Sequence, residues 1–192
     1  FHPEWPGHYN LDTYQHIEGY FRSRDIGQIW EYSNVIPMSD PDGRYADILN
    51  RFMPHVFDDR EDILKREYLS LQLNLDWMTM PLRRADKQSV LLYCGKVLRG
   101  ICNLAFLLDG KCYPNDKWMF HYLPSTGFGQ QYAKEIHDLY QASQHLDEIT
   151  PDREMSLYEQ HSTAAVLVEY IIEALLREFH DRQWIREWYF YV

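Results

Sequence analysis

Apolar residues repeat at the α-helical period over most of this chain, and that pattern limits the possible fold more than any other feature of the sequence. From residue 58 onward they recur at alternating spacings of three and four, which places them on one face of a helix. A helix with one apolar face must bury it against other helices, so the sequence predicts a mainly α fold with a bundle of four to five helices. The three longest stripes are Leu64, Tyr68, Leu71, Leu75 and Met78; Val90, Cys94, Val97, Ile101, Leu104 and Leu108; and Met155, Tyr158, Ser162, Ala165, Val168, Ile172, Leu175 and Phe179.

Local signals set the expected bounds of these helices. Asp58 is predicted to be the N-cap of the first long helix, with Glu61 completing a capping box, and Pro81 is predicted to end it. Gly110 is the expected residue just past the end of the second helix. We interpret residues 58–192 as one bundle domain. The first helix is predicted to touch two neighbours, because a second apolar stripe lies beside the first: Leu69, Leu73, Trp77 and Met80.

Residues 1–57 have a mixed pattern and predict a small β-containing segment before the bundle. The stretch Ile29–Ile36 is rich in β-branched and aromatic residues, which favours a strand. The sequence Asp40-Pro41-Asp42-Gly43 combines residues that favour a turn. Two carboxylates at this spacing can also hold Mg²⁺ in nucleotidyltransferases, but the chain has no Gly-Ser pair to cradle phosphates, so the turn is the preferred interpretation.

The charge of the chain limits its partners. The formal net charge is -10, whereas nucleic-acid binding needs clustered Lys and Arg, so no nucleic-acid partner is expected. The acidic charge permits a cationic substrate or a basic partner. No stretch is expected to span a membrane, because charged or polar residues interrupt each apolar run.

The three cysteines, Cys94, Cys102 and Cys112, are too few and too widely spaced for a disulfide framework or a zinc ribbon. They favour a reducing cytoplasmic location, and Cys94 and Cys102 are predicted to be small core residues. The histidines include no HExxH motif, and His137 and His145 are predicted to lie on the surface. No residue is assigned to a metal site.

Motifs for nucleophilic catalysis or phosphate binding are missing from the sequence, and we assign no catalytic residue. One polar stripe is a candidate for ligand binding. Lys96, Arg99 and Asn103 are spaced i, i+3 and i+7, which places them on one helix face. This face is either solvated or lines a cleft in which the cations meet an anionic ligand.

Residues 106–119, with the sequence FLLDGKCYPNDKWM, resemble the helical C-terminal domain of nucleotidyltransferase-fold proteins, the group that includes kanamycin nucleotidyltransferase. In that family a core helix ends in an apolar run, a Tyr-Pro loop follows, and Lys-Trp opens the next helix. The matching residues here are Tyr113, Pro114, Lys117 and Trp118. The resemblance is looser over residues 58–179, where it rests on helix order. Residues 30–43 also resemble the last strand and turn that link the catalytic sheet to this bundle.

The resemblance implies that residues 58–192 are the substrate-binding domain of a nucleotidyltransferase and that residues 1–57 are a remnant of its catalytic domain. The family transfers a nucleotide from a nucleoside triphosphate with Mg²⁺, which a catalytic half upstream of this chain would have to bind. The chain alone is then inactive but binds a small-molecule acceptor. The oligomeric state stays open. The candidate substrate-binding residues are Lys96, Arg99, Asn103, Tyr113, Lys117 and Trp118.

Two alternatives remain at this point. Lys117 and Trp118 can be purely structural, with Trp118 in the core and Lys117 capping the carbonyls of the preceding helix. The whole chain can also be a stand-alone helical interaction module, whose acidic surface recognises a basic protein partner.

Overall fold

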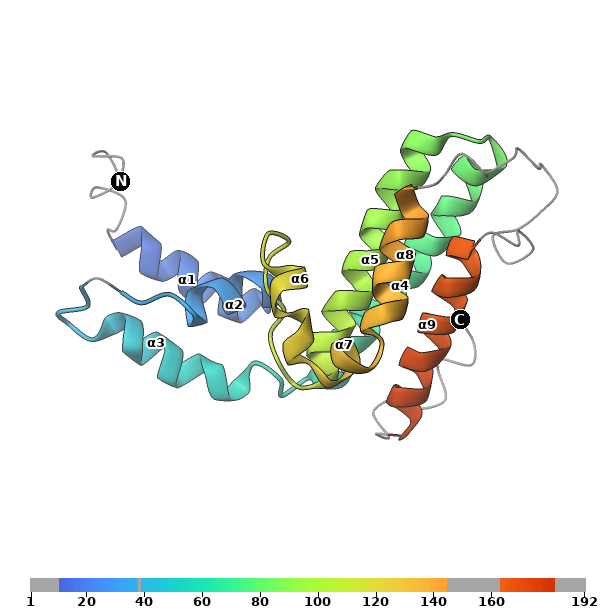
Figure 1. Ribbon diagram of the computed structural model, residues 1–192. Helices are drawn as coiled ribbons and strands as arrows, with labels where there is room; N and C mark the ends of the chain where they lie inside the picture. The colour runs from blue at the N-terminus through green and yellow to red at the C-terminus, as the bar shows by residue number, and fades with distance from the viewer. Residues whose placement is uncertain (1–10, 38, 145–162, 182–192) are drawn as a thin grey trace.

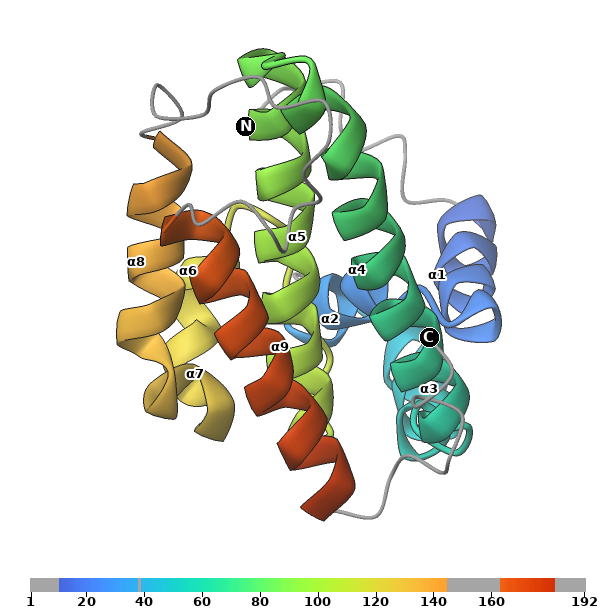
Figure 2. The same cartoon turned by 90° about the vertical axis from the view of Figure 1, so that its right-hand side faces the viewer.

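The computed structural model describes residues 11–37, 39–144 and 163–181, and the regular structure over these ranges is helical throughout. The helices α4 (Arg60–Arg83) and α5 (Lys87–Leu108) form a long antiparallel hairpin. The helices α8 (Ala133–Gln144) and α9 (Thr163–Asp181) pack against each other and against α5 (Figure 2). The predicted mainly α fold is therefore confirmed, although the described residues contain more helices than the four to five expected.

Shorter helices complete the structure. The helices α6 (Met119–Tyr122) and α7 (Gly127–Gln131), separated by a 3₁₀ turn at Leu123–Ser125, follow α5. Before the hairpin, the chain forms an N-terminal arm that extends away from the bundle (Figure 1). The arm consists of α1 (Leu11–Ser23), α2 (Ile26–Ser33), α3 (Arg44–Phe52) and a 3₁₀ turn at Met53–His55.

The central element is α5, which contacts α4, α6, α7, α8 and α9. Every residue from Ile101 to Leu108 is buried. Within the described residues, this one helix is long and apolar enough to cross a membrane, contrary to the expectation that no stretch qualifies. However, 61% of its apolar window is buried inside the bundle, as is usual for a core helix.

The last carbonyl groups of α5 are capped by hydrogen bonds from the following turn and from α4. Gly110 has a φ of 68°, as expected for the residue after a helix, and the N–H of Lys111 bonds to the carbonyl of Phe106 at 3.0 Å. From α4, the Arg60 guanidinium donates hydrogen bonds to the carbonyls of Leu107 and Leu108 at 3.1 and 2.9 Å. A cation at this position also complements the negative end of the helix dipole.

The predicted capping of α4 is wrong. The helix begins at Arg60, its N-cap is Asp59, and the side chain of Asp59 makes no capping hydrogen bond. Asp58 instead accepts a hydrogen bond from Nδ1 of His55 at 2.8 Å, so its side chain interacts with the turn that precedes α4. Pro81 lies inside the last turn rather than ending the helix, which continues to Arg83.

The predicted strand at Ile29–Ile36 is also wrong, because its first half belongs to α2. The side chain of Asp25 caps this helix by accepting a hydrogen bond from the N–H of Gln28 at 3.2 Å. Ile26 and Ile29, three residues apart, are both fully buried on one face. Packing of that face outweighs the weak strand propensity of β-branched residues. The resemblance of residues 30–43 to a strand and turn of a catalytic sheet fails for the same reason.

The turn at residues 40–43 is confirmed. Gly43 has a φ of 65°, and both carboxylate oxygens of Asp40 accept hydrogen bonds at 3.1 Å from the backbone N–H groups of Tyr45 and Ala46. Asp40 thus caps the start of α3 and is fully engaged, as the turn interpretation requires.

The core follows the predicted stripes with one exception. The first stripe of α4 and the stripe of α5 are buried, including Cys94 and Cys102. Leu73, Trp77 and Met80 of the second α4 stripe are exposed. The described residues therefore leave most of this second stripe uncovered. Ile172 and Leu175 of the last stripe are buried, whereas residues 155–162 lie outside the described ranges.

Candidate functional site

Two predicted site residues meet at the carboxylate of Glu67 on α4. The amide nitrogen of Asn103 donates to Glu67 Oε2 at 3.1 Å, and the hydroxyl of Tyr113 donates to Oε1 at 3.2 Å. The Nε of Arg66 lies 3.9 Å from Oε1. The side chain of Glu67 is only 15% exposed, so these donors replace most of the water that its charge would otherwise bind.

Burial and the negative charge of Glu67 raise the pKa of Tyr113 far above its ordinary value. Its hydroxyl is therefore protonated at neutral pH and available as a hydrogen-bond donor. The turn at Gly110 carries the chain from α5 back toward α4, which places Tyr113 within reach of Glu67.

The same loop is tied to α2 of the N-terminal arm. A Cβ added to Gly27 would lie 3.6 Å from the ring of Tyr113, so the two residues are close neighbours. One helical turn later, Glu31 accepts a hydrogen bond from the amide of Asn115 at 3.4 Å, and its carboxylate lies 3.8 Å from Nζ of Lys117.

These contacts form one group of polar side chains where the arm meets the bundle, which we call the junction cluster: Glu31, Glu67, Asn103, Tyr113, Asn115 and Lys117. Among the described residues, the Oδ1 atoms of Asn103 and Asn115 are buried and accept no hydrogen bond. Asn103 is only 5% exposed. Buried acceptors of this kind are uncommon and mark a place where a donor from a ligand or a water can bind.

Arg99 and Trp118 lie at the edge of the junction cluster. Arg99 forms an exposed ion pair with Asp116 at 3.1 Å. Trp118 is 42% exposed, and its ring contacts those of His121 and Tyr122. The alternative that Trp118 is a core residue is therefore wrong. Lys117 does not cap the preceding helix either, because Arg60 contacts those carbonyls.

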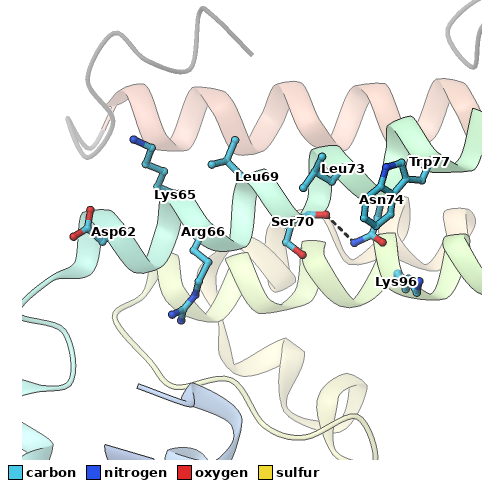
Figure 3. A pocket seen from close by; sticks show the side chains of 9 residues that line it. All are labelled: Asp62, Lys65, Arg66, Leu69, Ser70, Leu73, Asn74, Trp77 and Lys96. Carbon is cyan, nitrogen blue, oxygen red and sulfur yellow. Dashed lines mark hydrogen bonds between the residues drawn. The ribbon is translucent and has the colours of Figure 1, made fainter. Parts of the chain in front are cut away.

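Lys96 does not join the cluster. Its Nζ lies 4.6 Å from the centre of the Tyr93 ring, and it lines an open groove of ≈ 680 Å³ along α4 together with Leu69, Leu73 and Trp77 (Figure 3). The predicted polar face of α5 is therefore divided. Asn103 is covered by α4, Arg99 faces the 113–118 loop, and Lys96 borders the groove, because α4 and the loop cover α5 at different levels.

Sequence reasoning missed Glu31, Glu67 and Arg60. A signal existed for Glu67, which lies three residues after Leu64 and four before Leu71, on the edge of a buried stripe. A carboxylate at such a position needs partners and is a candidate for a buried polar contact. Glu31 carried no such signal, because its partners lie more than eighty residues away along the chain.

The described part of the chain contains no group of three or more His, Cys, Asp or Glu residues placed to hold a metal ion. His137 is exposed, as predicted, and contacts Gln141 at 3.4 Å, whereas His145 lies outside the described ranges. Comparisons with protein families, curated proteins and solved structures find no match to this chain. The resemblance to nucleotidyltransferases and the function it implies therefore stay predictions.

Proposed function

We propose that this chain binds a small molecule at the junction cluster, as the acceptor-binding helical domain of a nucleotidyltransferase-like protein. The observation that carries the proposal is the pair of buried amide oxygens on Asn103 and Asn115, which lie beside two carboxylates. Leaving a buried acceptor without a donor costs about 1–3 kcal/mol, so a ligand that supplies donors gains this energy on binding.

The segment that carries the family resemblance is also the segment that builds the junction cluster. Tyr113 and Lys117 contact Glu67 and Glu31, and Trp118 offers a partly exposed ring at the edge. Both observations support the same location, although one comes from a sequence pattern and the other from contacts with α2 and α4.

The chemistry of the cluster defines the ligand. Carboxylate and amide oxygens accept hydrogen bonds, so the ligand should carry hydroxyl or amino groups. The nucleophile that attacks a nucleoside triphosphate is a group of this kind. Transfer itself would require the Gly-Ser and Asp-x-Asp motifs of a separate catalytic half, which would hold Mg²⁺ and the triphosphate. The function proposed for this chain is binding and positioning the acceptor.

The test is calorimetric titration of the chain with a panel of polyhydroxylated and amino-substituted small molecules. Lys117→Ala should weaken the binding of any ligand found while leaving the melting temperature almost unchanged, because an exposed ion pair contributes only about 0–1 kcal/mol. The matched control is Lys134→Ala, which removes an exposed lysine paired with Asp138 on α8. Equal binding by the native chain and Lys117→Ala would contradict the proposal, as would the lack of saturable binding across the panel. An equal loss of binding and of melting temperature would assign Lys117 a structural role.

A further inference from the structure

One row of apolar side chains on α4 is exposed in the part of the chain that the structure describes. Leu73, Trp77 and Met80 are 48%, 55% and 53% exposed, and Leu69 is partly buried beside them. We call these four residues the α4 stripe. Single exposed apolar side chains are common on protein surfaces, whereas a row that includes a tryptophan is typical of a surface that binds another molecule. Leu69, Leu73 and Trp77 also line the groove of ≈ 680 Å³ (Figure 3).

The exposed face of α4 is arranged symmetrically about Leu73. Leu69 and Trp77 lie four positions before and after Leu73, and Asp62 and Arg84 lie eleven positions before and after it. Both spacings are close to whole helical turns, so all five residues share one face of the helix. Asp62 and Arg84 are exposed. The apolar residues therefore lie at the centre of this face, with an acid at one end and a base at the other.

This arrangement is complementary to itself. If two copies of α4 pack antiparallel about a twofold axis at Leu73, each residue faces the one at the mirrored position of the second copy. Leu73 then meets Leu73 of the second copy, and Leu69 meets Trp77 of the second copy. Asp62 meets Arg84 of the second copy, so two symmetry-related ion pairs flank the apolar contact. One helix face thus supplies both halves of an interface, as in the twofold dimers that are the commonest protein oligomers.

The charges of α4 disfavour the other arrangements. In a parallel pair every residue would face its own copy, so Asp62 and Arg66 would each meet an identical charge. An antiparallel pair with its axis at residue 75 would place Arg66 opposite Arg84 of the second copy. The axis at Leu73 instead places Arg66 opposite Met80, where the aliphatic part of the arginine covers an apolar side chain. The position of the axis therefore follows from the charge pattern.

We propose that two copies of this chain associate through their α4 stripes, packed antiparallel about a twofold axis at Leu73. Charge complementarity identifies the second copy as the occupant, because Asp62 and Arg84 match only when α4 faces itself in this register. The interface covers the tryptophan and both leucines of the stripe. This inference is independent of the proposed ligand site, because the α4 stripe shares no residue with the junction cluster.

The first experiment is sedimentation equilibrium of the full chain over a range of concentrations. The native chain should form dimers. Leu73→Glu should weaken association by about tenfold or more, because it places two carboxylates together at the axis. Phe120→Glu is the matched control, since Phe120 is 53% exposed on α6, and it should associate like the native chain. A native chain that stays monomeric, or a Leu73→Glu variant that associates equally well, would overturn the proposal.

A charge reversal tests the register. Asp62→Arg and Arg84→Asp should each weaken association severalfold, because each creates like charges at facing positions. The double variant Asp62→Arg, Arg84→Asp restores opposite charges and should recover the association of the native chain. Recovery of this kind separates a direct contact from damage to the fold. Single variants that associate normally, or a double variant that does not recover, would overturn the proposed pairing.

A cross-link tests the position of the axis. Leu73→Cys places one thiol of each copy at the axis, so mild oxidation should give a disulfide-linked dimer on a non-reducing gel. Burial raises the pKa values of the native thiols to about 11 for Cys94 and about 12 for Cys102 and Cys112, so these cysteines react little. Phe120→Cys is the control and should stay monomeric. A Leu73→Cys variant that forms no more linked dimer than this control would overturn the proposal.

Discussion

Removing a single oxygen atom from Tyr113 tests the centre of the junction cluster. Tyr113→Phe keeps the buried ring but deletes the hydroxyl that donates to Glu67 at 3.2 Å. A hydrogen bond to a charged group contributes about 1.5–3 kcal/mol. Arg66 stays 3.9 Å away, and Glu67 is partly exposed, so water and Arg66 replace some of the lost interaction. We therefore expect the free energy of unfolding to fall by about 1–2 kcal/mol, near the lower end of this range.

For a chain of this length, that change corresponds to a decrease of about 2–8 °C in melting temperature. The assay is urea unfolding followed by circular dichroism, in which the midpoint shifts and the slope stays constant. Tyr140→Phe is the matched control, because Tyr140 is 43% exposed and its ring lies beside that of His137 on the surface of α8. Its effect should be below about 0.5 kcal/mol. If the two variants are equally stable, the hydroxyl of Tyr113 does not stabilise Glu67 and the reasoning fails.

Three further predictions concern packing and capping. Trp118→Ala should lower the free energy of unfolding by about 1–2 kcal/mol, because Trp118 is 42% exposed. A loss of about 3–5 kcal/mol, measured by thermal unfolding, would instead place Trp118 in the core. Gly129→Ala should lower the free energy of unfolding by about 2–3 kcal/mol in the same assay, because the new Cβ would lie 2.3 Å from the carbonyl oxygen of Leu123. Gly95→Ala is the control: its new Cβ would have no atom within 4 Å, so the free energy of unfolding should rise by about 0.5–1 kcal/mol. Equal effects of the two substitutions would refute the close contact at Gly129. Hydrogen bonds from Ser89 lower the pKa of Asp86, so its contribution to stability is present above the ordinary carboxyl pKa of about 4 and is lost as the pH falls through the lowered value. The stability difference between the native chain and Asp86→Ala should therefore shrink in acid, and a difference independent of pH in urea unfolding would contradict this.

The sequence predicted those parts of the site that depend on local order. Tyr113, Lys117 and Trp118 were identified by the resemblance of residues 106–119 to a known helical domain, and Asn103 by its place on a helix face. The partners of these residues could not be predicted, because Glu31 and Glu67 come from other helices and neither spacing nor composition links them to the loop. The sequence also grouped Lys96 with Arg99 and Asn103, although Lys96 lies outside the junction cluster. A helical wheel shows which residues share a face of α5, but it does not show which neighbouring segment covers each turn.

The sequence by itself determined that the chain is mainly helical, that the first stripe of α4 and the stripe of α5 are buried, and where α5 ends, because periodicity and glycine geometry act within a few residues. The tertiary structure alone decided that Ile29–Ser33 is helical, that Arg60 closes the end of α5 and that one stripe of α4 stays exposed in the described residues. The physical reason is range: helix formation and capping are local, whereas burial of a face and the pairing of a buried charge depend on contacts between residues far apart in the chain.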